Sequence, residues 1–222
     1  MNELKSIALH YFNLGLNINC IKNEVTEHNF SKKEILKNPY HDYKKWIKEA
    51  QSLQDVLMFD WNAATGIGIV TGFQNLRVID IDGCENIDFI KDLLSILGLP
   101  RDYEWLVKSG SGIGYHIYFY TDEIDEEKSK YFFNFEDYFF GRYGSYLPYD
   151  NYLKSELFSA SFYPNDDNLS LFERMDFIWK SNIIAPFSMH KSSKRYVFCN
   201  EFLPFNKPLK IDFERLEIIK TM

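Results

Sequence analysis

Two aspartates, Asp80 and Asp82, lie within an apolar run and are separated by a single isoleucine. If this segment is a strand, side chains alternate between its faces, so both carboxylates point the same way, about 7 Å apart along the chain. Two such carboxylates repel each other unless a cation lies between them. Mg²⁺ or Mn²⁺ binds oxygen ligands of this kind and keeps positions for water and phosphate. The pair therefore predicts a divalent metal site able to activate a hydroxyl for attack on a phosphate. The alternative is two acids that end an exposed strand before Gly83.

A second stretch whose residues could take part in chemistry is the glycine-rich loop from Ser109 to Gly114. Its three glycines free backbone N–H groups to face an anion. His116 follows on the next expected strand, on the same face as Tyr118. His116 and the loop residue Ser111 are therefore candidates to bind a triphosphate. The alternative is a glycine-rich hairpin with a core histidine.

A third stretch combines one more acid with a dense group of donors. Asp176 is a lone carboxylate in an apolar, strand-like segment, so it is the candidate third metal ligand. Hydrogen-bond donors of a kind that binds phosphate oxygens come next in the chain. They are Ser188, His190, Lys191, Lys194 and Arg195. The alternative for the basic residues is a solvated turn.

Helices and strands alternate irregularly around these residues. Apolar periodicity and caps predict helices over 4–12, ended by Gly15, and 86–97, with a broken helical region over 46–57. Strands are expected over 16–21, 66–71, 75–82, 105–108, 115–120, 174–179, 182–185 and 195–199, the second and third joined around Gly72 as a hairpin. Residues 121–170 are expected to be an irregular insertion with short helices. The pattern predicts an α+β fold with a mixed or antiparallel sheet.

Composition narrows the class of protein. The chain has 222 residues, 45% of them hydrophobic, which is enough for one sizeable domain. The net charge of −7 disfavours tight binding of duplex DNA through phosphate contacts alone. The three cysteines form no C-x-x-C pair, which fits a reducing compartment. Since no run approaches the length of a membrane span, we expect a cytoplasmic protein without a membrane partner.

The three stretches, in this order, resemble the bifunctional primase-polymerase (prim-pol) domain of the archaeo-eukaryotic primase superfamily. They read GIGIVTGFQNLRVIDIDG, SGSGIGYHIYF and MDFIWKSNIIAPFSMHKSSKRYVF. The segments YFNLGLNINCI and NPYHDYKKW resemble the family's N-terminal strand and its "K-x-P…W" segment. Two positions depart from the family pattern, since Phe187 replaces its second proline and Ser193 its glycine.

The resemblance implies a two-lobed archaeo-eukaryotic primase fold over residues 1–222, with an RRM-like catalytic sheet. An N-terminal α/β module of about 1–65 would interleave with a catalytic lobe of about 66–200. Asp80, Asp82 and Asp176 would be the catalytic residues that bind Mg²⁺ or Mn²⁺. His116 would contact the incoming nucleotide, and Ser188, His190 and Arg195 would line the triphosphate site, a set to which we add Lys194.

The activity implied is DNA-templated nucleotidyl transfer from NTPs or dNTPs to a 3′-hydroxyl, which makes or extends primers. Single-stranded template and primer would bind weakly to the chain alone. A helicase, or another replication or CRISPR-associated protein, would be the protein partner. Two other readings stay open: a nucleotide- or nucleic-acid-binding module without catalysis, and a haloacid-dehalogenase-type phosphatase, whose first motif VIDIDG also resembles.

Overall fold

The computed structural model describes residues 2–28, 32–39, 42–122, 144–147, 158–164, 171–212 and 214–216, with side chains over 2–22, 42–122, 171–212 and 214–216. Helices combine with two antiparallel sheets, which agrees with the expected α+β class. None of the helices in these ranges has the length and apolar character needed to cross a bilayer.

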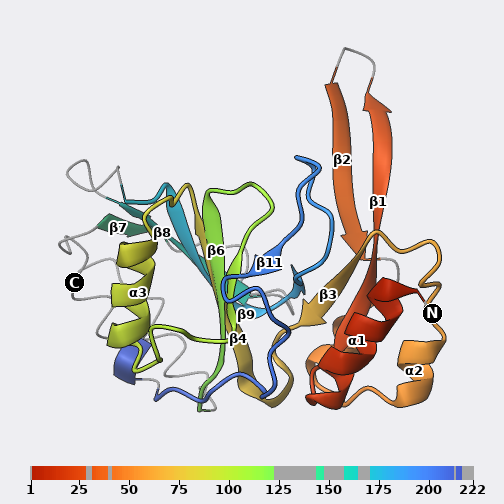
Figure 1. The fold of residues 1–222 in the computed structure, drawn as a ribbon, viewed down its shortest axis with the longest axis horizontal. Coiled ribbons are helices and arrows are strands. Elements are labelled where there is room, and N and C mark those ends of the chain that lie inside the picture. Colours follow the sequence, from red (N-terminus) through yellow and green to blue (C-terminus); the bar gives the residue numbers. More distant parts are fainter. Residues whose placement is uncertain are drawn as a thin grey trace.

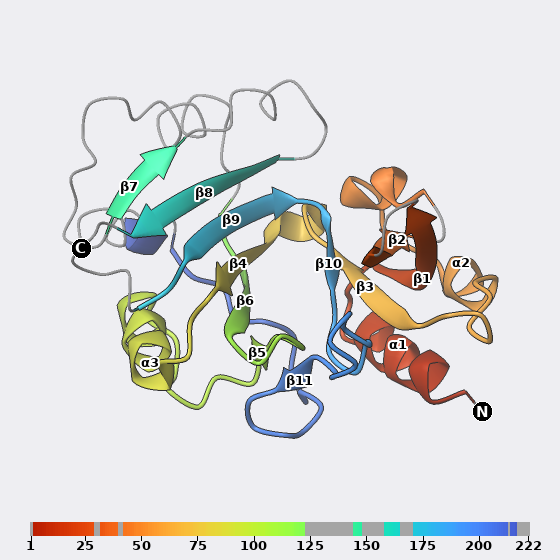
Figure 2. The same cartoon turned by 90° about the horizontal axis from the view of Figure 1, so that it is seen from above.

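A seven-stranded sheet, called the large sheet below, carries the predicted acids (Figures 1 and 2). Its strand order is β11-β5-β6-β4-β9-β8-β7, and every neighbouring pair is antiparallel. The strands are β4 (Leu76–Asp82), β5 (Leu106–Lys108), β6 (Gly114–Tyr120), β7 (Gly144–Leu147), β8 (Phe158–Pro164), β9 (Arg174–Lys180) and β11 (Val197–Phe198). The acid-bearing strand β4 therefore lies in the middle, between β6 and β9.

A four-stranded sheet, the small sheet, has the order β10-β3-β1-β2. Its strands are β1 (Ile18–His28), β2 (Lys32–Pro39), β3 (Gly66–Val70) and β10 (Asn182–Ile184). Figure 1 shows β1 and β2 projecting as a long arm beyond the rest of the chain. The sequence predicts a strand over 16–21 followed by a polar stretch, so this arm is a correction. The polar residues of β1 and β2 lack the apolar alternation that marks a half-buried strand.

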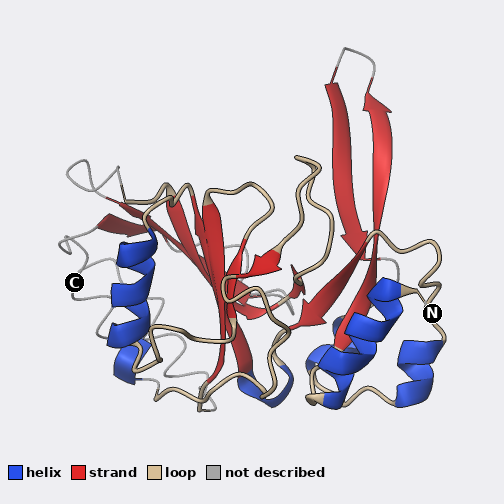
Figure 3. Ribbon diagram, in the orientation of Figure 1, coloured by secondary structure: helices blue, strands red, loops and turns tan. Residues whose placement is uncertain are grey.

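Three α-helices, among the segments coloured blue in Figure 3, flank the sheets, and side-chain caps start each of them. In α1 (Glu3–Asn13) the Asn2 side chain accepts from Leu4 N, and in α3 (Ile87–Ile96) the Asn86 side chain accepts from two backbone N–H groups. A capping box of Ser52 and Asp55 opens α2 (Leu53–Leu57). In Figure 2, α3 covers one side of the large sheet and the small sheet lies toward the other.

Two of the chain's crossings between the two sheets lie at neighbouring places. One crossing runs from β3 to β4 and the other from β9 to β10, with Ser181 between the latter strands. Thr71 N donates to Ser181 O at 2.9 Å, and Ser181 N donates to Thr71 Oγ1 at 2.8 Å. The two sheets are therefore joined by a pair of crossings that are bonded to each other.

This arrangement corrects the hairpin expected around Gly72, because β3 and β4 belong to different sheets. Gly72 has φ +104°, and Gln74 and Asn75 also have positive φ, so the backbone turns out of the small sheet instead of folding back on it. The insertion over 121–170 needs a second correction, because β7 and β8 extend the large sheet there. The short helices expected in that insertion lie outside the described residues.

Candidate active site

Asp80, Asp82 and Asp176 lie on one face of the large sheet. On β4 the two acids share a face because they are two residues apart. Asp176 on β9 is the direct cross-strand partner of Asp80, so its side chain lies on that same face. The three carboxylates proposed from the sequence therefore come from adjacent strands at adjacent positions.

His116 flanks this group from the other side. It pairs with Asp80 across β4 and β6, and its Nε2 lies 3.2 Å from Asp80 Oδ1. The imidazole is buried, whereas the Asp80 side chain keeps 24% of its surface exposed. One row across the sheet thus reads His116, Asp80, Asp176, with the histidine already bonded to the central acid.

Arg174 is a site residue that the motif analysis missed. It begins β9 directly opposite Asp82, and its guanidinium contacts two of the acids. Nη2 lies 2.7 Å from Asp82 Oδ2, and Nε lies 3.3 Å from Asp176 Oδ2. Its position two residues before Asp176 puts both side chains on one strand face, so strand alternation alone could have identified it.

The position opposite Asp82 on β6 is Gly114, which contributes no side chain beside the carboxylate. A Cβ at Gly114 would come within 2.8 Å of Ile81 O, so the strands approach too closely there for any larger residue. Asp82 is consequently flanked by a cation on β9 and by bare backbone on β6. The carboxylate is left accessible on the β6 side, and half of its side-chain surface is exposed.

Burial and neighbouring charges shift the pKa values of Asp82 and Tyr196 in this site. Partial burial raises the pKa of Asp82, and the charge of Asp80 raises it further, while Arg174 lowers it. Burial also raises the pKa of the Tyr196 phenol, and the charges of Asp80 and Asp82 add to that increase. Tyr196 therefore stays neutral at physiological pH and can act as a hydrogen-bond donor beside the acids.

Tyr196 also links the acids to the donor loop of residues 186–195. Its ring centroid lies 5.4 Å from that of His116 and 5.7 Å from that of His190. The sequence assigns Tyr196 no role, since a lone tyrosine near a strand start is most simply explained by core packing. In the structure its ring contacts both His116, which is bonded to Asp80, and His190 of the donor loop.

The glycine-rich loop and the donor loop are in direct contact. Ser192 Oγ donates to Gly110 O at 2.5 Å, and His190 Nδ1 accepts from Ser192 N at 3.1 Å. Any Cβ at Gly110 would collide with His190, so only glycine permits this approach. The ammonium of Lys194 lies close to Gly112 and brings a cation to the place where the two loops meet, which suits an anion. The N–H groups of Gly112 and Ile113 donate within the glycine-rich loop, to Ser109 O and Ser111 Oγ.

Three other predicted nucleotide-binding residues are placed less favourably. Ser188 is buried, and its hydroxyl accepts from Ile67 N at 2.8 Å and donates to Ile67 O at 3.1 Å. Arg195 turns to helix α1, where Nη1 lies 3.6 Å from Glu3 Oε2. Ser111 is exposed and bonds Ser109 within its own loop. The hydroxyl of Ser188 holds the donor loop against β3, and the structure does not offer it to a ligand.

The two departures from the family pattern occupy unusual backbone. Phe187 has φ +68° and Ser193 has φ +64°, the left-handed region. At Ser193 the family's glycine would adopt this conformation without strain. At Phe187 the family's proline could not, because its ring fixes φ near −65°. The backbone at Phe187 is therefore one that a proline could not adopt.

Among the side chains that the structure describes, no three from His, Cys, Asp or Glu meet at metal-ligand separation. The donor set nevertheless suits a cation, because the Arg174 guanidinium already lies against Asp82 and Asp176. Hard oxygen donors of this kind are the ones that Mg²⁺ and Mn²⁺ take.

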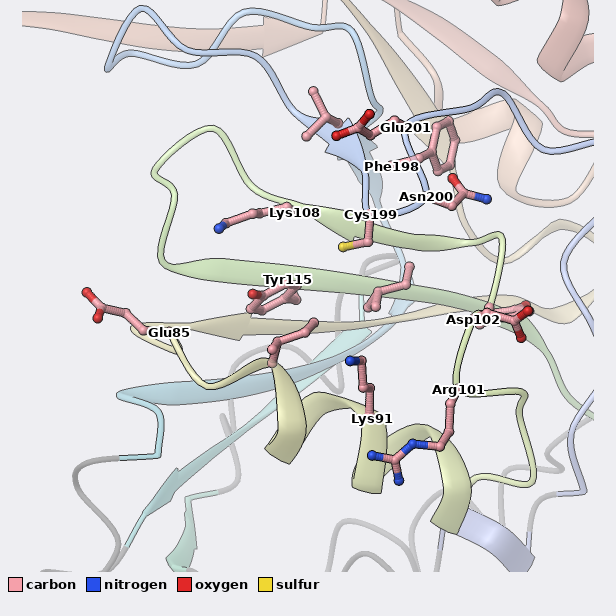
Figure 4. Close-up of a pocket in the computed structure, with 14 residues that line it drawn as sticks. Glu85, Lys91, Arg101, Asp102, Lys108, Tyr115, Phe198, Cys199, Asn200 and Glu201 are labelled. Carbon is pink, nitrogen blue, oxygen red and sulfur yellow. The ribbon is translucent and has the colours of Figure 1, made fainter.

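A groove of about 620 Å³ lies elsewhere on the chain, between α3, β5 and β11 (Figure 4). Tyr115 lines it, and because His116 is the next residue on the strand, the groove and the acids are on opposite faces of the sheet. Its charged lining is mixed, with Lys91, Arg101 and Lys108 opposed by Glu85, Asp102 and Glu201. The groove is therefore separate from the acidic site.

Comparison with known proteins gives one result. A family model described as "Bifunctional DNA primase/polymerase, N-terminal" matches residues 8–210. The match spans all three stretches identified from the sequence and most of the chain. A comparison with curated proteins gives no match.

Proposed function

The chain belongs to the bifunctional DNA primase/polymerase family, and we propose that its acidic face transfers nucleotides to a 3′-hydroxyl on a DNA template. The substrates would be NTPs or dNTPs, and the products new or extended primers. One observation supports the site above all others: Asp176 on β9 pairs directly with Asp80 on β4, on the face that also carries Asp82.

In this proposal Asp80, Asp82 and Asp176 hold two divalent cations, Mg²⁺ or Mn²⁺, which family members use. When bound, such ions activate the attacking 3′-hydroxyl and neutralise charge on the pyrophosphate leaving group. The bond that forms joins the 3′-oxygen to the α-phosphorus, and the bond between the α- and β-phosphates breaks. His116 contributes by orienting Asp80 through its 3.2 Å contact.

The nucleotide's triphosphate would lie where the glycine-rich loop meets the donor loop. The Lys194 ammonium and His190 would bind phosphate oxygens there. Ser111 would add a hydroxyl from the exposed rim. Tyr196 would position the substrate with a neutral hydroxyl, because its raised pKa keeps the phenol protonated.

Two further features belong to the proposal. The large sheet would correspond to the RRM-like lobe of the two-lobed primase fold, and the small sheet with α1 and α2 to the N-terminal module.

Template would bind weakly, because a chain with net charge −7 repels the phosphate backbone outside local basic patches. A helicase or another replication or CRISPR-associated protein would then hold the template.

The haloacid-dehalogenase reading fits the sheet poorly. That reading needs its first aspartate at the end of a strand in a Rossmann-like parallel sheet. Here β4 is antiparallel to both β6 and β9. Binding without catalysis is the other function that the site allows, since His116 and Arg174 already contact Asp80 and Asp82.

A primer synthesis and extension assay tests the proposal. Wild-type protein is supplied with single-stranded template, with or without primer, with Mg²⁺ or Mn²⁺, and with NTPs or dNTPs separately. We expect metal-dependent incorporation that Asp80→Asn abolishes. Nucleotide binding without incorporation under every condition would refute catalysis and favour the binding module.

A further inference from the structure

Arg174 occupies the cation position of the acidic face. Its guanidinium lies 2.7 Å from Asp82 Oδ2 and 3.3 Å from Asp176 Oδ2, so one positive charge joins two carboxylates from adjacent strands. The contact with Asp82 is a charge-assisted hydrogen bond, a kind about twice as strong as a neutral one, whereas the contact with Asp176 is an ion pair. The guanidinium thereby relieves part of the repulsion that would otherwise act across the acids.

The oxygens that Arg174 contacts are the ones a divalent ion would need. A carboxylate oxygen that accepts from a guanidinium at 2.7 Å cannot also approach a metal at bonding distance along the same direction. A guanidinium and a metal ion between Asp82 and Asp176 would also repel each other. Arg174 and a metal ion therefore compete for Asp82 Oδ2 and Asp176 Oδ2.

We propose that Arg174 is a built-in counter-ion that competes with divalent metal for Asp82 and Asp176. It holds the acids together in the metal-free protein and has to leave when metal binds. This inference rests on the proposed metal site and adds that metal affinity is set by a competing side chain. Metal binding is weaker than the carboxylates alone would give, and the metal-free fold is more stable.

A comparison with Arg77 supports the capacity of Arg174 to leave. Arg77 is buried, and its Nη1 donates to the backbone oxygens of Leu76 and Trp179 at 3.1 and 2.9 Å. Arg174 keeps 42% of its side-chain surface exposed and lies at the first position of its strand. Arg77 cannot leave without exposing buried carbonyls, whereas Arg174 can rotate into solvent once a metal takes over its two carboxylates.

The test is a Mn²⁺ titration without nucleotide or template, in which free Mn²⁺ is measured by electron paramagnetic resonance. We expect Arg174→Gln to bind Mn²⁺ about tenfold more tightly than wild type, since the competing charge is gone. The metal-free melting temperature of this variant should fall, and its increase on addition of Mn²⁺ should exceed that of wild type. Arg174→Lys should lie between the two, because a point charge cannot bond both acids through a planar fork.

Arg101→Gln is the matched control. Arg101 also pairs with an aspartate, at 2.9 Å from Asp92, but it lies on the surface away from the acids. Its removal should change neither Mn²⁺ affinity nor the response of the melting temperature to Mn²⁺. Equal or weaker Mn²⁺ binding by Arg174→Gln overturns the counter-ion role. If that variant does not fold, equal or weaker binding by Arg174→Lys overturns it instead.

The experiment separates this inference from the proposed function. Asp82→Asn combined with Asp176→Asn removes the proposed metal ligands. If wild type and Arg174→Gln bind Mn²⁺ no better than this double variant, the metal site itself is wrong and the counter-ion role falls with it. If wild type binds better than the double variant but Arg174→Gln shows no tightening, the site stands and the counter-ion role alone fails.

Discussion

His116 Nε2 lies 3.2 Å from Asp80 Oδ1, on neighbouring strands at directly opposed positions. A histidine that touches a candidate metal ligand acts on the metal through that ligand. The same ring cannot donate from Nε2 to a phosphate without giving up Asp80. This pair therefore changes the role expected for His116 from nucleotide contact alone to orientation of the carboxylate.

His116→Ala should lower Mn²⁺ affinity and the rate of nucleotide incorporation by about 10- to 100-fold, the usual cost of losing a partner of a metal ligand. Mn²⁺ titration and primer extension measure the two effects. His190→Ala is the control, since His190 bonds Ser192 in the donor loop and should leave Mn²⁺ affinity unchanged. Weaker nucleotide binding by His116→Ala at unchanged Mn²⁺ affinity would restore the direct nucleotide role.

Asp176→Asn should reduce incorporation by on the order of a hundredfold or more, because an amide binds a divalent cation much more weakly than a carboxylate, and the proposed cations stabilise the charge of the leaving group. The Asp176 side chain is only 18% exposed, but the loss of its ion pair with Arg174 is offset by relief of repulsion from Asp80, so unfolding free energy should change by no more than about 1 kcal/mol. Primer extension and urea unfolding measure these. Asp92→Asn, which breaks a surface pair with Arg101, should leave incorporation intact. Activity of Asp176→Asn within a few-fold of wild type would remove Asp176 from the site.

Lys194→Gln should weaken nucleotide binding about tenfold, since its ammonium lies beside the glycine-rich loop and would lose a charge-assisted bond to phosphate. Isothermal titration with a non-hydrolysable triphosphate gives the affinity. Arg195→Gln should stay within about twofold of wild type, because Arg195 faces Glu3 in an exposed pair. A tenfold loss in Arg195→Gln would mean that Arg195 leaves Glu3 to bind the nucleotide, as the resemblance implies.

Ser193→Gly should raise the free energy of unfolding by about 0.5–1 kcal/mol, because φ +64° is strained for serine and free for glycine. Chemical denaturation measures the gain. Ser192→Gly is a useful contrast, since it removes the bond to Gly110 O and should destabilise. No gain in Ser193→Gly would show that the strain is relieved elsewhere in the donor loop.

Arg77→Leu should cost about 1–3 kcal/mol of unfolding free energy, because buried carbonyls of Leu76 and Trp179 lose their donor. Urea denaturation gives the value. Lys180→Leu, at the exposed end of β9, is the control and should change stability little. A loss below about 0.5 kcal/mol in Arg77→Leu would mean that water replaces the guanidinium.

The Asp80 and Asp82 pair could be predicted from the sequence because it is local. Asp80 and Asp82 share a strand, and strand alternation fixes their common face. The position of Asp176 opposite Asp80 needed the family resemblance, since nothing in the sequence sets the register between strands almost a hundred residues apart. Arg174 was missed because a basic residue at a strand start is ordinarily solvated, and its two partners come from different strands.

The fold was harder to predict where strands change sheet. The segments around Gly72 have the spacing of a hairpin, yet the crossing bonded between Thr71 and Ser181 sends them into separate sheets. Local pattern carries no information on which sheet a strand joins. The β1–β2 arm escaped prediction for a different reason, as its polar residues give no periodic apolar signal.

The late position of β10 in the chain has a consequence for synthesis on the ribosome. β3 pairs with β1 early, but its other edge is bonded by Asn182–Ile184, which emerges only after the acids, α3 and most of the large sheet. During translation that edge of β3 is an unpaired strand, the kind of surface that associates with other chains. We therefore expect chains released before Ile184 to aggregate, and the nascent protein to depend on a chaperone until that point.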